Sequence, residues 1–182
     1  MGKKPIIIVG GEPNSVFLEI FFKSLKTNTF KSPLIIIISK KLLQEQMKKL
    51  GFTFKINDID KKLKDFSKLN NKKINLINVD YDFKKCFEKI TSKSNRYINE
   101  TFETALDIIK KNNFSKFING PISKKYFLKG KSLGITEYLA NKTKKDKVAM
   151  LIFNKDLSVS PLTTHLALKN VHKKITKQKI YT

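Results

Sequence analysis

Four short stretches of this chain combine glycines or small residues with side chains that bind polar or charged ligands. The first is residues 10–15, Gly-Gly-Glu-Pro-Asn-Ser, directly after a β-branched run. A glycine turn between a strand and a helix lets the backbone approach a ligand at the carboxyl edge of a sheet. The stretch lacks the G-x-G-x-x-G spacing of dinucleotide-binding turns and the Gly-Lys-Ser/Thr of a P-loop. A purely structural turn with Ser15 as the helix N-cap would explain it equally well.

The second and third stretches each place a candidate ligand-binding side chain a few residues after a glycine. Residues 119–124 read Asn-Gly-Pro-Ile-Ser-Lys, and Lys124 is a candidate for holding an anion such as a phosphate. Residues 134–140 read Gly-Ile-Thr-Glu-Tyr-Leu-Ala, the expected start of a helix. The hydroxyl of Thr136 would then lie in the first turn beside free backbone N–H groups, which suits a polar substrate. Helix capping alone would also explain that threonine.

The fourth stretch is Thr163-Thr164-His165, and it contains one of the only two histidines in the chain. His165 directly follows an expected strand, which is where α/β enzymes place their sites. His172 lies in an expected lysine-rich helix and is interpreted as a solvated residue. A single imidazole cannot hold a catalytic metal alone, because such sites rest on about three protein ligands.

The elements that must position these stretches alternate between short β-branched runs and amphipathic, lysine-rich runs. This alternation is typical of βαβ units on a mostly parallel sheet. We expect strands at residues 5–9, 34–39, 74–79, 116–118, 147–153 and 157–162, the last two forming a pair. We expect helices at residues 15–26, 40–50, 95–112, 135–142 and 167–179. The segment 51–73 has the weakest pattern, with a short strand at 53–56 and a polar helix at 60–69.

The expected helix at 95–112 has the clearest periodicity. Its apolar residues recur at helical spacing and fall on one stripe: Ile98, Phe102, Ala105, Ile108 and Ile109. Such a stripe faces the core of a globular protein.

The formal net charge of +23 would attract a polyanion such as nucleic acid. Of the 38 basic residues, however, only Arg96 is arginine, and the lysines are scattered along the whole chain. Proteins that read bases or grip phosphates favour arginine for its planar, bidentate group. Lys, Asn, Ile and Phe are over-used together, as adenine- and thymine-rich codons would produce. We therefore expect no specific nucleic-acid partner, and a basic nucleic-acid-binding module stays the alternative reading.

Cysteine content and hydropathy bear on the compartment. The single Cys86 excludes an internal disulfide and agrees with a reducing cytoplasm. No apolar run approaches the roughly 20 residues of a membrane span. The first residues lack the long apolar core of a secretory signal. We expect a cytoplasmic protein without a membrane partner.

Taken in order, the four stretches resemble the 4-hydroxythreonine-4-phosphate dehydrogenase family. The family's Gly-Asp/Glu-Pro turn is matched by residues 11–13, and its Gly-Pro-Ile-x-Lys turn by residues 120–124. Its Gly-His-Thr-Glu-Tyr/Phe-Leu-Ala stretch is matched by residues 134–140 except at one position. Its Thr-Thr-His is matched by Thr163, Thr164 and His165. Flanking matches are Glu19, Ile20, Leu166, Leu168, Val171, Ile175 and Thr176.

The resemblance implies a three-layer αβα, isocitrate/isopropylmalate dehydrogenase-like fold with a mostly parallel sheet and two lobes, here incomplete because the second lobe is partly missing. It implies a homodimer that oxidises 4-phosphooxy-L-threonine with NAD and a divalent metal (Zn, Mg or Co), followed by decarboxylation, on the route to pyridoxal phosphate. By resemblance, His165 is one of three metal-ligating histidines and Thr136 binds substrate. Lys124 joins Thr136 as a candidate substrate-binding residue.

Two departures from the family pattern lie near these residues. Ile135 stands where the family has a substrate-binding histidine, and residues 14–18 replace a glycine-containing stretch. The chain corresponds to a little over half of a family member, so the other metal histidines and most of the nicotinamide site are expected beyond Thr182. We interpret residues 1–182 as the amino-terminal portion of a two-lobe dehydrogenase, with no internal boundary assignable, that is inactive alone. A non-catalytic relative that binds a phosphorylated amino acid is a further alternative.

Overall fold

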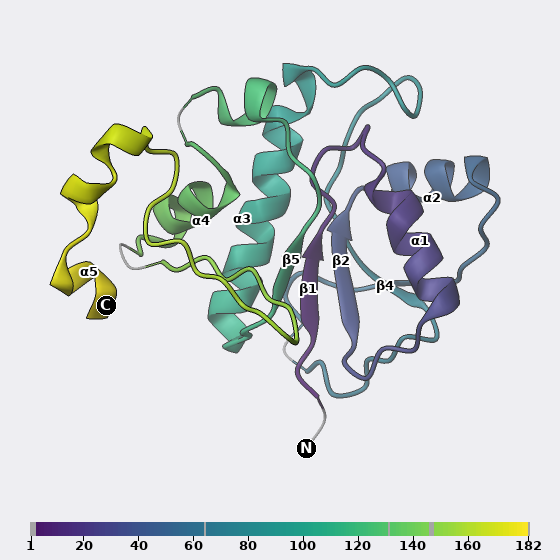
Figure 1. Ribbon diagram of the computed structural model, residues 1–182. Helices are drawn as coiled ribbons and strands as arrows, with labels where there is room; N and C mark the ends of the chain where they lie inside the picture. Colours follow the sequence, from purple (N-terminus) through teal and green to yellow (C-terminus); the bar gives the residue numbers. More distant parts are fainter. Residues whose placement is uncertain (1–2, 64, 131, 146–147, 182) are drawn as a thin grey trace. The chain divides into compact units, whose positions relative to one another are not determined.

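The computed structural model describes residues 3–63, 65–130, 132–145 and 148–181 (Figure 1). The chain divides into two compact units, Met1–Phe127 and Leu128–Thr182, a boundary that the sequence pattern does not mark.

A five-stranded, all-parallel sheet forms the centre of the first unit. Its strands follow the spatial order β3 (Ile56–Asp58), β4 (Ile74–Asn78), β2 (Leu34–Ile38), β1 (Ile6–Val9) and β5 (Phe117–Asn119). Ile7 of β1 is in register with Ile35 of β2 on one side and with Phe117 of β5 on the other. All five residues of β2 are buried, as continuous β-branched runs are in parallel sheets covered on both faces.

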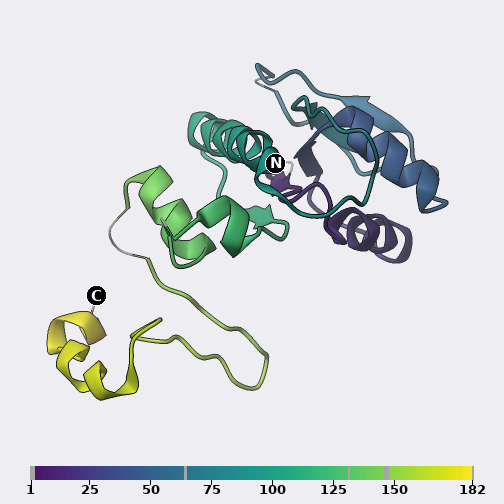
Figure 2. The same ribbon diagram turned by 90° about the horizontal axis from the view of Figure 1, so that it is seen from above.

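Helices cover both faces of this sheet. The helices α1 (Phe17–Thr27) and α2 (Lys40–Lys49) pack against each other on one face. On the opposite face, α3 (Asn95–Asn112) packs against β1 and β2 (Figures 1 and 2). The expected three-layer αβα arrangement on a parallel sheet is therefore present.

The apolar stripe expected on α3 faces this core. Ile98, Phe102, Ala105 and Ile108 are buried, whereas Ile109 at the margin of the stripe is half-buried. The helix ends at Asn113, which adopts a left-handed conformation and donates its N–H to the carbonyl of Ile109. Asparagine tolerates that conformation better than most residues, so the helix stops where the sequence predicts.

Segment 51–73 differs from its prediction. The strand β3 begins at Ile56 instead of covering residues 53–56, and no helix forms among the described residues of 60–69. The carboxylates of Asp60 and Asp65 accept hydrogen bonds from the N–H groups of Lys62 and Ser67. Such local bonds stabilise turns in competition with the helix.

In the second unit the helix α4 (Ile135–Thr143) forms as expected, but the predicted strand pair is wrong. Residue 147 lies outside the described residues. Between 148 and 162 the described backbone makes a single isolated antiparallel bridge, in which Ile152 and Val159 exchange hydrogen bonds of 2.8 and 2.9 Å. The side chains of Leu151 and Phe153 are 62% and 74% exposed. A two-residue pairing that no other layer of its unit covers does not extend into strands.

The helix predicted at 167–179 is also wrong. Short 3₁₀ turns at Leu168–Asn170 and His172–Lys174 are followed by α5 (Lys177–Tyr181). Ile175 between them is extended. Most side chains in this segment are exposed, and a short helix without a packing partner is marginal in water. Among the described residues, no helix has both the length and the apolar character to cross a bilayer.

Candidate functional site

Two glycine turns meet at the carboxyl edge of the parallel sheet. Gly10 and Gly11 follow β1, and Gly120 follows the neighbouring β5. The N–H of Gly120 donates to the carbonyl of Val9 at 2.7 Å, and the N–H of Glu12 donates to the carbonyl of Pro121 at 2.8 Å. The predicted placement of both turns at the ends of strands is confirmed.

The backbones of the two turns approach each other so closely that only glycine fits. Gly11 has a φ of +71°, and a Cβ there would lie 2.3 Å from the carbonyl oxygen of Pro121. A Cβ on Gly120 would lie 2.1 Å from the carbonyl oxygen of Gly10. Contact between the turns therefore explains these glycines, without a ligand being needed.

Glu12 places a buried carboxyl group at the same edge. It is 3% exposed, and its two carboxyl oxygens accept hydrogen bonds from the hydroxyl of Ser94 at 2.9 Å and from the N–H of Asn14 at 3.4 Å. Burial raises the pKa of Glu12, and these two hydrogen bonds oppose the rise. Within the described part of the chain, no lysine pairs with it.

Two tyrosines lie close enough to this carboxyl group for its charge to act on them. Tyr97 of α3 is 5% exposed, its hydroxyl accepts the N–H of Ser39 at 3.1 Å, and its ring centroid lies 4.6 Å from that of Tyr81. Burial raises the pKa of both tyrosine hydroxyls, and the negative charge of Glu12 adds to each rise. Glu12, Ser39, Tyr81, Ser94 and Tyr97 thus form a polar cluster at the strand ends, here called the edge cluster.

The turn that carries Glu12 is fixed from two sides. The side-chain amide of Gln46 in α2 donates to the carbonyl of Pro13 at 2.7 Å, and this contact is buried. The carbonyl oxygen of the Asn14 side chain accepts the N–H of Glu88 at 3.1 Å. The loop after β4 is therefore held against this turn.

Sequence reasoning did not single out the edge cluster. The only available signals were an acidic residue inside a glycine turn and a serine directly after β2. Their convergence depends on contacts between segments far apart in the chain.

Lys124 also lies at the carboxyl edge of the sheet. It is exposed and begins the short helical turn Lys124–Leu128, directly after the Gly120 turn. The hydroxyl of Ser123 accepts the N–H of Tyr126 at 3.2 Å and so orders this turn. Among the described residues Lys124 forms no ion pair, which leaves its ammonium group available to an anion.

Thr136 lies in the first turn of α4, as predicted, and is half-buried. Gly134 is the N-cap residue in an extended conformation, so the first N–H groups of the helix lie beside Thr136. Ile135 begins the helix and is also half-buried.

His165 does not follow a strand, so that part of its prediction is wrong. It lies exposed in irregular backbone with a φ of +54°. In the described ranges, no three His, Cys, Asp or Glu side chains are grouped to hold a metal ion. His165 offers one imidazole, and the residues described here do not by themselves fit a divalent metal centre.

The three predicted site residues are divided between the two units. Lys124 belongs to the first, and Thr136 and His165 to the second. Their convergence on one cleft stays a prediction.

An all-parallel sheet covered on both faces, with glycine turns and a buried polar cluster at its carboxyl edge, defines an α/β protein of the class in which ligands bind at that edge. Solved structures of 4-hydroxythreonine-4-phosphate dehydrogenases share the fold. The enzyme from Burkholderia phymatum has a TM-score of 0.80 at 22% identity, covering 98% of this chain and 55% of that chain. The putative enzyme from Salmonella typhimurium has a TM-score of 0.82 at 17% identity, with 98% and 57% covered.

Sequence comparison identifies the family. The family described as "Pyridoxal phosphate biosynthetic protein PdxA" matches residues 29–182, and the chain belongs to this family. The 4-hydroxythreonine-4-phosphate dehydrogenase of Sulfurihydrogenibium sp. is 31% identical over 178 residues, 96% of this chain and 54% of the relative. The enzyme of Colwellia psychrerythraea is 27% identical over 177 residues, with 96% and 54% covered. The chain therefore spans about half the length of these relatives.

Proposed function

We propose that this chain is the amino-terminal portion of an enzyme that oxidises 4-phosphooxy-L-threonine with NAD on the route to pyridoxal phosphate. The observation that carries the proposal is the family match over residues 29–182, which includes three of the four candidate stretches. In the proposed reaction the substrate hydroxyl is oxidised, and the resulting β-keto acid loses carbon dioxide. The enzyme would act as a homodimer when complete.

In this proposal, Lys124 and Thr136 contribute to substrate binding. The ammonium group of Lys124 supplies a positive charge for the substrate phosphate, and the hydroxyl of Thr136 supplies a hydrogen bond. The edge cluster holds in place the glycine turn beside which a ligand would bind. NAD and a divalent metal enter only through the family, because His165 alone does not complete a metal site.

The chain alone is expected to be inactive. It spans about half the length of the relatives, and we propose that the residues holding the nicotinamide near the substrate carbon belong to the other half. Such positioning contributes roughly 7–11 kcal/mol to catalysis. The purified chain with 4-phosphooxy-L-threonine, NAD and a divalent metal should form no NADH above the metal-free control. Turnover that is abolished by His165→Ala would show that this half is sufficient.

A fusion tests the proposal in the positive direction. We would join the chain in frame to the remaining carboxy-terminal part of the Sulfurihydrogenibium relative, and we expect metal-dependent NADH formation. His165→Ala should lower metal affinity by at least about tenfold. His172→Ala, which removes the other histidine, should leave it unchanged, and Ile135→His should be neutral or raise activity. A folded fusion that binds the phosphorylated amino acid without turnover would instead favour the non-catalytic relative.

One relative points to a second substrate. A protein of Oceanobacillus iheyensis named "Putative D-threonate 4-phosphate dehydrogenase" is 25% identical over 189 residues and matches the whole chain. D-threonate 4-phosphate carries a hydroxyl at the carbon where 4-phosphooxy-L-threonine carries an amino group. The fusion should be assayed with both substrates, and the ratio of kcat/KM decides between them.

A further inference from the structure

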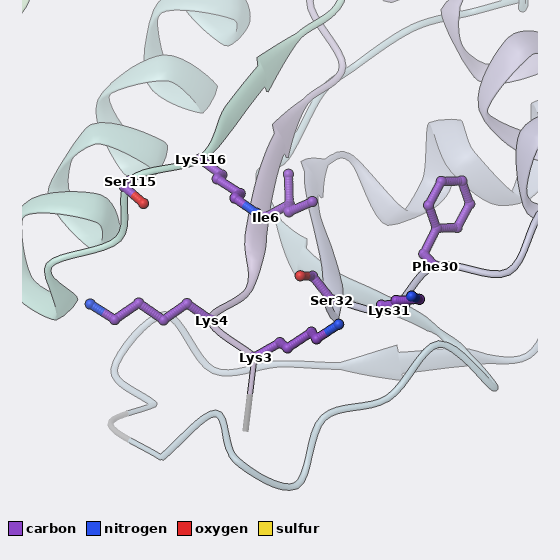
Figure 3. Close-up of a pocket in the computed structure, with 8 residues that line it drawn as sticks. All are labelled: Lys3, Lys4, Ile6, Phe30, Lys31, Ser32, Ser115 and Lys116. Atoms are coloured by element: carbon purple, nitrogen blue, oxygen red, sulfur yellow. The ribbon is translucent and has the colours of Figure 1, made fainter. Parts of the chain in front are cut away.

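A cavity of about 470 Å³ lies at the amino edge of the sheet, at the opposite end of the strands from the glycine turns. Its lining comes from three segments that precede the adjacent strands β1, β2 and β5. Figure 3 shows these segments around one shared space. The volume is within the range of small-molecule sites, about 300–1,000 Å³.

Lysines dominate this cavity, here called the amino-edge pocket. Lys3, Lys4, Lys31 and Lys116 line it, and among the described residues no acidic side chain does. Lys4 donates to the carbonyl of Asn113 at 2.9 Å and is thereby held in place. In the described part of the chain, the other three lysines form no ion pair. Their like charges repel one another unless an anion lies between them.

Two hydroxyl groups add hydrogen-bonding capacity. Ser32 and Ser115 line the same cavity, and in Figure 3 their hydroxyls point inward from opposite sides. A hydroxyl donates to an anionic oxygen as readily as it accepts, so the pair adds donors between the ammonium groups. Unpaired cations together with inward hydroxyls are the groups that bind phosphate oxygens.

We propose that the amino-edge pocket binds a small anion with two or more phosphate groups. A single phosphate carries about −1.5 to −2 at neutral pH, which would leave positive charge uncompensated among three unpaired lysines. A short chain of phosphates brings enough negative charge and several acceptor oxygens. The pocket lies apart from the glycine turns and the edge cluster, because all five strands run parallel and those features lie at the opposite edge of the sheet.

Isothermal titration calorimetry with tripolyphosphate tests the proposal on the full 182-residue chain. At about 0.15 M salt, attraction between distant exposed charges is largely screened, so a built site should stand out. We expect saturable binding of one anion per chain. The triple variant Lys3→Gln, Lys31→Gln, Lys116→Gln should weaken it by about tenfold or more.

A charge-matched control separates a site from general attraction. The triple variant Lys55→Gln, Lys85→Gln, Lys89→Gln removes three exposed lysines elsewhere in the same unit. Both triple variants have a formal charge of +20, three below the +23 of the chain. Binding of the control variant should stay within about twofold of the unmodified chain.

A third variant, Ser115→Glu, keeps the test possible if the triple variant fails to fold. It places a carboxylate at an exposed lining position and should abolish binding of the anion. Three outcomes would overturn the proposal. The first is equal weakening in both triple variants, and the second is binding of more than one anion per chain. The third is tight binding of single-stranded DNA that both triple variants weaken alike.

Discussion

At the scale of single residues, Glu12 shows how the carboxyl edge is built. A buried carboxylate loses favourable hydration, and the hydroxyl of Ser94 and the N–H of Asn14 restore part of that loss. Burial outweighs these bonds, because the pKa of Glu12 is raised. The hydrogen bonds of Glu12 therefore fix the turn, but ionisation of its buried carboxyl group lowers the free energy of unfolding.

This cost predicts the pH dependence of a Glu12→Gln variant. The pKa of Glu12 is higher in the folded than in the unfolded state, so the free energy of unfolding falls as pH rises through these two values and the penalty persists above them. Glutamine keeps the shape without ionising. Its amide can donate to the hydroxyl of Ser94, which in turn donates to the carbonyl of Thr91. We expect Glu12→Gln to be as stable as the unmodified chain or more stable at pH 7, and this relative advantage to shrink near about pH 4.

Urea unfolding at the two pH values measures this difference. Glu88→Gln, at an exposed position, is the control and should show no such pH-dependent gain. The burial argument would be contradicted if the stability of Glu12→Gln, relative to the unmodified chain, were lower at pH 7 than near about pH 4.

At the scale of elements, the two glycine turns connect neighbouring strands into one edge. The backbone bonds from Gly120 to Val9 and from Glu12 to Pro121 require the turns to touch. A side chain at either contact would separate β1 from β5 at the edge where a ligand is expected. The glycines therefore determine the geometry of the site through the spacing of its elements.

Two alanine substitutions separate the effect of this contact from simple backbone strain. Gly11 and Gly51 both have a φ of +71°, but an added Cβ at Gly51 meets no atom within 4 Å. Gly51→Ala should therefore cost about 1–2 kcal/mol of unfolding free energy, for the left-handed conformation alone. Gly11→Ala adds a clash with the carbonyl of Pro121 and should cost about 2–5 kcal/mol. Equal losses in urea unfolding would show that the contact between the turns does not matter.

At the scale of the whole molecule, the two units differ in how they are stabilised. The first has an extensive buried core on both faces of its sheet. In the second, Leu128 is the one buried residue among those described, and several large apolar side chains between 148 and 162 are exposed. In the proposed enzyme, we expect these side chains to be covered.

Limited proteolysis tests this contrast. Thermolysin cleaves beside apolar residues, and proteases act on segments that open easily. The exposed apolar residues of 148–162 should be cut first, leaving a product that retains residues 1–127. Mass spectrometry of the early products identifies the sites. First cuts within the strands of the sheet, at rates equal to those in 148–162, would show that the first unit is no more stable than the second.

Much of the first unit follows from local sequence. The β-branched runs of β1, β2 and β4 and the apolar stripe of α3 were predicted within one or two residues. Continuous β-branched runs mark strands that are buried on both faces, and the stripe of α3 repeats with the helical period. The second unit did not follow in this way. Its expected strands and last helix had suitable apolar residues, but a pattern forms an element only when another surface covers it.

The sequence by itself determined the α/β class, the glycine turns at strand ends, and the positions of Lys124 and Thr136 beside such turns or at a helix start. The tertiary structure alone decided that Glu12 is buried, because its partner Ser94 lies 82 positions away. It likewise decided that Gly11 must be glycine, since the opposing carbonyl belongs to Pro121 in the turn that follows β5. Local sequence sets the conformations that a segment favours, whereas burial and charge at a site depend on which distant segments come to lie beside it.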